Sequence, residues 1–275
     1  ETVANPAGKI LDLKRFADIA HKHGVPMIVD NTFPTPILCR PIEFGVDIVT
    51  HSTTKYMDGH AMAVGGCIVD SGNFDWEAHH DKFKGLTEPD PSYHGLAYTK
   101  AFGKGAFITK ATAQLMRDLG SIQAPQNAFL LNVGLETLHL RMPRHCENAL
   151  ACAKFLQNHP KVAWVDYAGL EGNKYHELAQ KQFKGGLPCG VLTFGIKGGR
   201  EKSIQFMDNL KMICIVTPVA DARSCVLHPA SHTHRQLSDE PLIEAGVAPD
   251  LIRFSVGIEN VEDIIADLTQ ALDKV

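Results

Sequence analysis

The sequence lacks the features that mark several large classes of protein. No run of five or six like charges occurs, and 27 basic against 31 acidic residues give a formal net charge of −4. Nucleic acids and anionic membrane surfaces usually require clustered positive charge, so neither is an expected partner. Aromatic residues make up only 7% of the 275 residues, but hydrophobic residues reach 44%, enough for one large domain or two smaller ones. We therefore expect a globular protein with a small-molecule partner.

The seven cysteines follow no pattern of a disulfide framework or a zinc site. Their number is odd and no C-x-x-C pair occurs. Several lie in apolar runs, such as Cys67 in Gly-Gly-Cys-Ile-Val and Cys214 in Met-Ile-Cys-Ile-Val. We interpret them as buried thiols in a reducing compartment. Neither a signal-peptide pattern nor an apolar run of about twenty residues occurs, so we expect a cytoplasmic location.

The first half of the chain alternates apolar strands with helices or loops. Apolar residues recur at helical spacing over 9–23, and Gly24 stands where a helix C-terminal glycine belongs. Short apolar strands are predicted at 25–29, 46–50 and 65–69. This order predicts an α/β fold with a largely parallel sheet.

The pattern changes in the second half. A long helical pattern runs from residue 127 to about 157, and Pro143 is expected to kink it or break it in two. From about residue 159 strands and helices interleave. The strands are expected at 162–165, 191–196, 213–217 and 251–255, and the helices near 200–210 and 260–273. We predict two domains, one over 1–158 that includes the long linking helix, and a C-terminal α+β domain over 159–275.

Two ionisable residues follow neighbouring predicted strands. Asp30 closes the first strand, and Lys55 lies shortly after the second, preceded by hydroxyl residues at 52–54. Ligands of open α/β sheets bind beyond the carboxyl ends of the strands. Pyridoxal 5′-phosphate (PLP) needs a lysine amine for its imine, an anionic partner for its pyridinium nitrogen, and donors for its phosphate. On spacing alone, a surface lysine and a turn-capping aspartate explain the same residues.

Longer motifs resemble one family. Val29-Asp-Asn-Thr-Phe33 followed by His51-Ser-Thr-Thr-Lys-Tyr-x-x-Gly-His60 is similar to the cofactor-lysine signature of the cysteine/methionine-metabolism family of PLP enzymes. That family includes cystathionine γ-synthase, methionine γ-lyase and the O-acylhomoserine sulfhydrylases. The resemblance extends over essentially the whole chain, with further matches at Glu1-x-x-x-Asn5-Pro6, from Thr137 to His145 and from Ile252 to Glu259. It implies PLP as cofactor and an aspartate-aminotransferase-like transferase of fold type I, with residues 1–158 in the large PLP-binding domain.

The resemblance also implies roles for the residues around the cofactor. Lys55 forms the imine with the cofactor and later moves protons, and it is therefore the catalytic residue. Asp30 pairs with the pyridinium nitrogen and keeps it protonated. Ser52 and Thr54 hold the phosphate, and Asn5 reaches the ring hydroxyl.

Three residues are implied at the substrate end. Asn5 also reaches the substrate carboxylate, and Arg253 binds that carboxylate with two hydrogen bonds, which a lysine could not do as well. Ser224 supports the same end of the substrate. Without the resemblance, Arg253 would be interpreted as a surface residue at a strand end.

Three segments resemble the sulfhydrylase branch: 228–238, 245–253 and the loop at 88–95, which is shorter in methionine γ-lyases. We therefore expect γ-replacement on O-acetyl-L-homoserine with sulfide or a small thiol, giving homocysteine or methionine plus acetate. The alternatives are methionine γ-lyase, cystathionine γ-synthase or O-succinylhomoserine sulfhydrylase activity. A different alternative is a non-catalytic fragment or assembly module. The resemblance further implies a homotetramer whose active sites are shared between subunits.

Some features stand apart from the family pattern. Ala61 follows His60 where the family usually has glycine, at a turn where positive φ is expected. His228, His232 and His234 lack acidic partners or a helical spacing of metal ligands, so no metal is expected. The family's N-terminal stretch, with its glycine-rich phosphate turn and its stacking tyrosine, has no counterpart in this sequence. We expect the chain to be a fragment of a longer enzyme.

Overall fold

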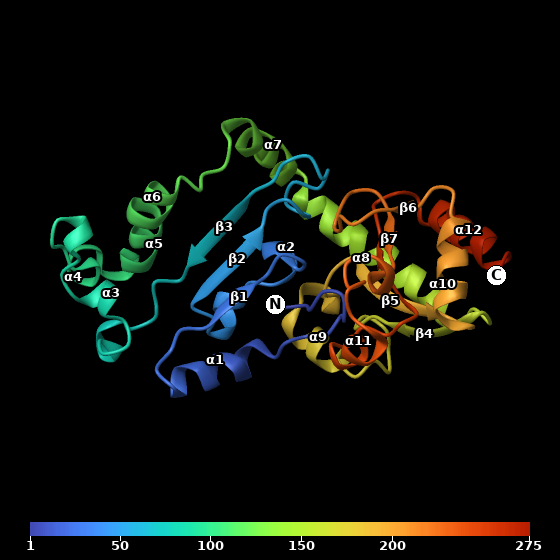
Figure 1. Ribbon diagram of the computed structural model, residues 1–275, viewed down its shortest axis with the longest axis horizontal. Helices are drawn as coiled ribbons and strands as arrows, with labels where there is room; N and C mark the ends of the chain where they lie inside the picture. Colours follow the sequence, from blue (N-terminus) through green and yellow to red (C-terminus); the bar gives the residue numbers. More distant parts are fainter.

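Two sheets lie on either side of a long helix. The computed structural model describes residues 1–275. A three-stranded sheet has the order β1-β2-β3 and a five-stranded sheet has the order β4-β5-β8-β7-β6. The helix α8 (Leu138–Gln157) runs from the first sheet to the second (Figure 1). No helix combines the length and the apolar character needed to cross a bilayer.

The first sheet is mixed. β1 (Ile28–Asp30) pairs with β2 (Ile48–Ser52) in parallel, whereas β3 (Gly66–Asp70) runs antiparallel to β2. The expectation that the third strand continues a parallel sheet is wrong. Parallel strands need a crossover of a dozen or more residues, usually a helix, and the connection at 53–65 is a series of turns without a helix.

The helix before the first sheet forms as expected. α1 (Leu13–Lys22) begins after Asp12, whose side chain accepts a hydrogen bond from the backbone N–H of Arg15. It buries Leu13 and Ala17, which lie four residues apart on one face. Gly24 follows the helix with φ of +59°, which confirms its expected role at the C-terminus.

Short helical segments connect these elements. Those after β1 are α2 (Thr35–Leu38) and η1 (Pro41–Phe44). Those after β3 are η2 (Glu77–His79), α3 (Lys84–Thr87), η3 (Pro91–Tyr93), α4 (Tyr98–Phe102), η4 (Gly103–Gly105), α5 (Ala106–Lys110), η5 (Ala111–Met116) and α6 (Arg117–Leu119). The segments after β3 pack around a small cluster that includes Trp76 and Tyr98 and also covers Ile48 of β2.

The long helical pattern divides at Thr137, not at Pro143. α7 (Pro125–Glu136) ends just before Thr137, which has φ of −107° and ψ of 1°, and α8 begins at the residue after Thr137. Pro143 lies inside α8, so the expectation that it breaks the helix is wrong. A proline in a helix deprives the carbonyl four residues earlier of its partner. That carbonyl belongs to His139, which is exposed like Pro143, so water can replace the lost bond.

The C-terminal part builds the second sheet. Its strands are β4 (Val162–Asp166), β5 (Val191–Ile196), β6 (Cys214–Ile215), β7 (Cys225–Leu227) and β8 (Leu251–Ser255). The bounds expected for β5 and β8 are confirmed, β6 is shorter than expected, and β7 was not predicted. The helical segments are α9 (His176–Gln182), η6 (Lys184–Gly186), α10 (Gly199–Asp208), η7 (Pro229–Ser231), α11 (Asp239–Glu244) and α12 (Val261–Leu272).

Two main apolar cores hold these layers. One contains 22 buried residues around α1, β1, β2 and the first half of α8, and it includes Phe183 and Val219 from the later chain. The other contains 21 buried residues between α8, α10, α12 and the second sheet. The seven cysteines are all free. Five are buried as expected, but Cys67 is only partly buried and Cys214 is exposed, because β6 is a two-residue strand at the sheet edge.

Candidate active site

The first two strands end at the same edge of their sheet. Asp30 is the last residue of β1 and pairs with Thr50, two residues before Ser52 ends β2. A carboxylate oxygen of Asp30 accepts a hydrogen bond from the backbone N–H of Thr32 at 2.8 Å. The hydroxyl of Thr32 in turn accepts from the N–H of Ser52 at 2.8 Å. These bonds fix the two strand ends relative to each other.

A tight turn brings Lys55 back toward this edge. Its backbone N–H donates to the carbonyl of Ser52 at 3.3 Å, and its own carbonyl accepts from the N–H of Gly59 at 2.8 Å. A cavity of about 120 Å³ opens at this place. It is lined by Glu1, Val3, Asn5, Asp30, Thr32, Phe33, Ser52, Lys55 and Val219. Four of the residues proposed from the sequence thus share one cavity.

Tyr56 anchors the lysine turn in the core. Its side chain is fully buried, and its hydroxyl accepts a hydrogen bond from the N–H of Gly190 at 3.1 Å. Its ring meets Phe33 edge to face at 6.4 Å between centroids and His145 at 4.8 Å. Because the neighbouring residue is fixed in this way, Lys55 projects from a rigid support.

Arg253 reaches the cavity region from the second sheet. It lies in β8, is only 6% exposed, and donates from one terminal nitrogen to the side-chain oxygen of Asn5 at 3.3 Å. Its other terminal nitrogen donates to the carbonyls of Thr217 at 2.7 Å and Pro218 at 3.3 Å. Its Nε is buried without a partner. A buried, cationic donor that is not saturated is suited to bind a carboxylate.

The pKa of Lys55 lies below its usual value. Partial burial is the larger cause, and the positive charge of Arg253 adds to it, whereas Cys225 acts in the opposite direction. A larger fraction of the amine is therefore unprotonated near neutral pH than for a free lysine. The unprotonated form is the one that can act as a nucleophile or a base.

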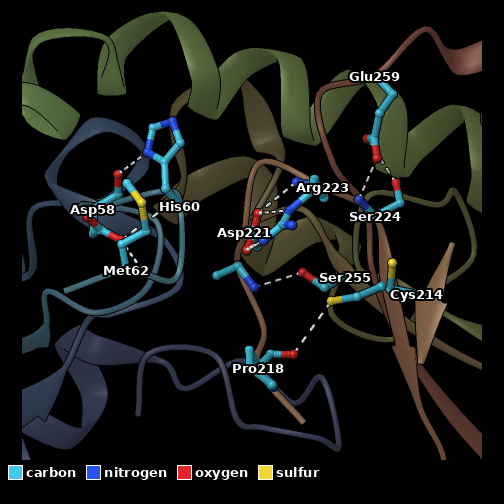
Figure 2. Close-up of polar contacts among 12 residues, drawn as sticks. Asp58, His60, Met62, Cys214, Pro218, Asp221, Arg223, Ser224, Ser255 and Glu259 are labelled. Carbon is cyan, nitrogen blue, oxygen red and sulfur yellow. Dashed lines mark hydrogen bonds and ion pairs between the residues drawn. The ribbon is translucent and has the colours of Figure 1, made fainter. Parts of the chain in front are cut away.

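Three of the proposed residues do not line the cavity: Arg253, Ser224 and Thr54. The Ser224 hydroxyl donates to the carboxylate of Glu259 at 3.0 Å (Figure 2) and accepts from the N–H of Gly257 at 2.9 Å. The Thr54 hydroxyl donates to the carbonyl of Gly65 at 3.3 Å and accepts from its N–H at 3.1 Å. In this arrangement the Ser224 hydroxyl holds the segment that follows β8, and the Thr54 hydroxyl holds the residue that precedes β3.

The polar face of α8 supports the site and was missed by the sequence analysis. Arg141 donates to the carbonyls of Tyr56 at 2.6 Å and Gly134 at 2.7 Å. The buried His145 bonds the carbonyl of Val256 at 2.7 Å, and burial lowers its pKa to about 4, so its ring is neutral. Asn148 donates to the carbonyls of residues 257 and 259, both at 2.9 Å. Polar residues at i, i+4 and i+7 on the buried face of a helix were the available signal.

Replacing Arg141 by methionine tests this support. We expect the free energy of unfolding to fall by about 3 kcal/mol, because buried carbonyls lose charged donors. PLP affinity is expected to weaken as the lysine turn loosens. Denaturant unfolding and a PLP titration measure the two effects. Arg144→Met, at an exposed position of the same helix, is the matched control, and equal stability of the two variants would contradict the role of Arg141.

The turn after Lys55 contains a strained alanine. A carboxylate oxygen of Asp58 accepts from the backbone N–H groups of His60 at 3.2 Å and Met62 at 3.1 Å (Figure 2). Between them Ala61 has φ of +53°, which confirms the positive φ expected from the family pattern. L-residues pay about 1 kcal/mol to adopt this conformation and glycine does not.

Ala61→Gly is therefore expected to raise the free energy of unfolding by about 0.5–1 kcal/mol. Denaturant unfolding measures the change. The control is Ala78→Gly at an exposed position in η2, where glycine should destabilise the protein instead. A loss of stability in Ala61→Gly would show that the turn carries no strain.

The sequence pattern of the family described as Cys/Met metabolism PLP-dependent enzymes matches residues 1–273. The chain belongs to this family. Members with similar sequences include a homocysteine synthase of Schizosaccharomyces pombe, 49% identical over 99% of this chain, and an O-acetyl-L-homoserine sulfhydrylase of Leptospira meyeri, 46% identical over all of it. The resemblance to the sulfhydrylase branch is thereby confirmed. The chain spans 64% of the length of each of these Cys/Met metabolism enzymes.

A solved member of the family has the same fold. The crystal structure of a putative O-acetylhomoserine (thiol)-lyase from Campylobacter jejuni, with an N′-pyridoxyl-lysine-5′-monophosphate, matches 99% of this chain and 64% of that one. The TM-score is 0.94 at 39% sequence identity. The α/β fold expected for a PLP-dependent transferase of fold type I is confirmed.

Proposed function

We propose that this chain takes part in PLP-dependent γ-replacement on O-acetyl-L-homoserine. Sulfide or a small thiol replaces acetate, and the product is homocysteine or methionine. The observation that carries the proposal is the meeting of Lys55 and Asp30 in one cavity with Asn5, to which Arg253 is bonded. The similarity to an O-acetyl-L-homoserine sulfhydrylase and a homocysteine synthase supports the choice of substrate.

The residues of the cavity fit PLP. The group requires an amine, an anionic partner and phosphate donors, and Lys55, Asp30 and Ser52 provide one of each at the end of one sheet. When bound, PLP supplies the electron sink that stabilises negative charge at the substrate α-carbon. Lys55 would hold the cofactor covalently and move the proton at the α-carbon. The Asp30 carboxylate would hold the proton at the pyridine nitrogen, and Ser52 would donate to the phosphate. For Thr54 to donate as well, its hydroxyl would have to release the carbonyl of Gly65.

The substrate carboxylate would bind on the side of the second sheet. Arg253 is buried, cationic and retains an unpartnered Nε, so it can add a carboxylate to its bonds. Asn5 is already bonded to Arg253 and would orient both the carboxylate and the cofactor ring hydroxyl. Ser224 would act through the segment that it bonds after β8, where its hydroxyl accepts from the N–H of Gly257.

The lowered pKa of Lys55 predicts how cofactor attachment depends on pH. Attachment requires the unprotonated amine, whose fraction rises as pH passes upward through the pKa. Because burial and Arg253 lower that pKa, the rate should rise at a lower pH than for free lysine. Stopped-flow absorbance after mixing protein with PLP at a series of pH values measures it. An N-acetyl-lysine amide run alongside is the control, and coincident midpoints would contradict the prediction.

Product analysis tests the proposed reaction. With O-acetyl-L-homoserine and sulfide, we expect acetate and homocysteine in equal amounts. Ammonia and an α-keto acid formed without an acceptor would identify a γ-lyase instead. Cystathionine formed with cysteine would identify a γ-synthase, and a preference for the succinyl ester would identify an O-succinylhomoserine sulfhydrylase.

We further propose a cytoplasmic homotetramer with active sites shared between subunits. The free and mostly buried cysteines are in keeping with a reducing compartment. Apolar side chains at the surface of the first sheet, such as Ile28 at 55% and Ile68 at 46% exposure, support further association. Light scattering coupled to size-exclusion chromatography measures the mass in solution.

A further inference from the structure

Two cysteines face each other on neighbouring strands of the second sheet. Cys214 of β6 pairs with Cys225 of β7 in a parallel register. The backbone N–H of Cys214 donates to the carbonyl of Ser224 at 3.2 Å, which fixes this register. Strands in a sheet lie about 4.8 Å apart, within the Cα separation of about 4.4–6.8 Å that a disulfide needs. Directly paired residues of parallel strands also point to the same face.

The two thiols differ in access to solvent. Cys214 is exposed on the edge strand, whereas Cys225 is 4% exposed in the next strand inward. Cys225 in turn pairs with Ser255 of β8, so the three residues form a row across three strands. Burial raises the pKa of the Cys225 thiol to about 11, so an oxidant would meet Cys214 first.

Cys225 shares a backbone anchor with Arg253. The Cys225 thiol donates to the carbonyl of Pro218 at 3.5 Å, and Arg253 donates to the same oxygen at 3.3 Å. The Ser255 hydroxyl accepts from the N–H of Ala220 at 2.8 Å, two residues further on. The segment that holds the guanidinium is therefore itself held by the row that contains Cys225.

We propose that Cys214 and Cys225 form a reversible disulfide when the protein meets a peroxide, and that the disulfide weakens binding of the substrate carboxylate. Hydrogen peroxide transfers one oxygen atom to the Cys214 thiol, which becomes a sulfenic acid. The other oxygen atom of the peroxide leaves as a water molecule. The Cys225 thiol then attacks that sulfur, and the hydroxyl leaves with the thiol proton as a second water. One S–S bond forms, both S–H bonds break, and two electrons pass to the peroxide.

The effect on the substrate follows from the shared anchor. The Cys214 thiol now donates to the carbonyl of Met212 at 3.8 Å, and Cys225 to that of Pro218, so both side chains must rotate to form the bond. Pro218 then loses one of its two donors, and the carbonyl that positions Arg253 is free to move. This second part rests on the proposed function and predicts a several-fold higher KM for the acylhomoserine.

Peptide mapping of the full-length holoenzyme tests the bond directly. The enzyme is treated with hydrogen peroxide, alkylated and digested with trypsin without a reductant. Trypsin cleaves after Lys211, Arg223 and Arg235, so Cys214 lies in the peptide 212–223 and Cys225 in the peptide 224–235. We expect the two peptides to be joined, with a mass lower than the sum of the two by two hydrogen atoms. Dithiothreitol should separate them again. Cys214→Ser should abolish the joined peptide, and the partly exposed Cys67→Ser control should retain it.

Kinetics test the consequence. KM of the treated wild-type enzyme should rise several-fold and return after dithiothreitol, while Cys214→Ser should keep its untreated KM. Cys214 recovered only as a sulfinic acid would overturn the disulfide. A joined peptide with unchanged KM would overturn the link to Arg253. If the enzyme proves inactive on acylhomoserines, the proposed function fails, and the peptide map still decides the disulfide.

Discussion

Replacing Lys55 by alanine is expected to abolish covalent PLP binding and to reduce turnover by more than about 10³-fold. The amine would be lost both as the attachment point and as the group that moves the α-proton. No other lysine lines the cavity, so no neighbouring amine can take its place. The measurement is the absorbance of the protein titrated with PLP, followed by borohydride reduction and mapping of the labelled peptide in the wild type.

The matched control for this variant is Lys14→Ala. Lys14 is exposed on α1, where it pairs only with Asp18. This variant should bind PLP and turn over substrate as the wild type does. Retained turnover in Lys55→Ala, or a label on any other lysine, would contradict the assignment of the site.

Arg253→Lys is expected to lower kcat/KM for the acylhomoserine by about 10²-fold, or about 3 kcal/mol, mainly through KM. Lysine keeps the charge but cannot donate at once to Asn5, to the carbonyls of Thr217 and Pro218, and to a carboxylate. Steady-state kinetics with varied acylhomoserine measure the loss. Arg117→Lys, at an exposed position in α6, should leave the constants unchanged.

A second variant at the same position separates charge from geometry. Arg253→Gln removes the positive charge that lowers the pKa of Lys55, so the pH profile of cofactor attachment should move upward. Arg253→Lys retains a positive charge at this position and should shift the pH profile less than Arg253→Gln does. Identical profiles for the two variants would show that the charge of Arg253 does not act on Lys55.

The parts of the fold that the sequence predicted are those with strong local signals. β5 and β8 are mostly apolar and contribute several residues to the second core, so their bounds are recognisable without tertiary context. β7 is only three residues long, and its existence depends on pairing with β8. The same limit explains β3, whose direction is decided by a turn-rich connection and not by its own residues.

In the candidate active site, too, residues in local motifs were predicted, whereas roles that depend on contacts with distant residues were not. Asp30 and Lys55 stand at strand ends in a recognisable motif, and the structure brings them into one cavity. Thr54 belongs to the same motif, but its hydroxyl bonds Gly65, which no spacing rule indicates. The support from Arg141 depends on contacts with Tyr56, 85 residues earlier in the chain, and long-range contacts of this kind leave no local pattern.

The polar face of α8 has a consequence for the length of substrate that the enzyme can accept. Arg141 holds the turn that carries Lys55, while Asn148 holds the segment that follows the strand of Arg253. Seven residues of helix separate these two attachments, a rise of about 10 Å. The distance between the Lys55 amine and the Arg253 guanidinium is thus set by the rigid helix α8. One residue inserted between positions 141 and 148 would turn one attachment by about 100° and detach one end of the site from the other.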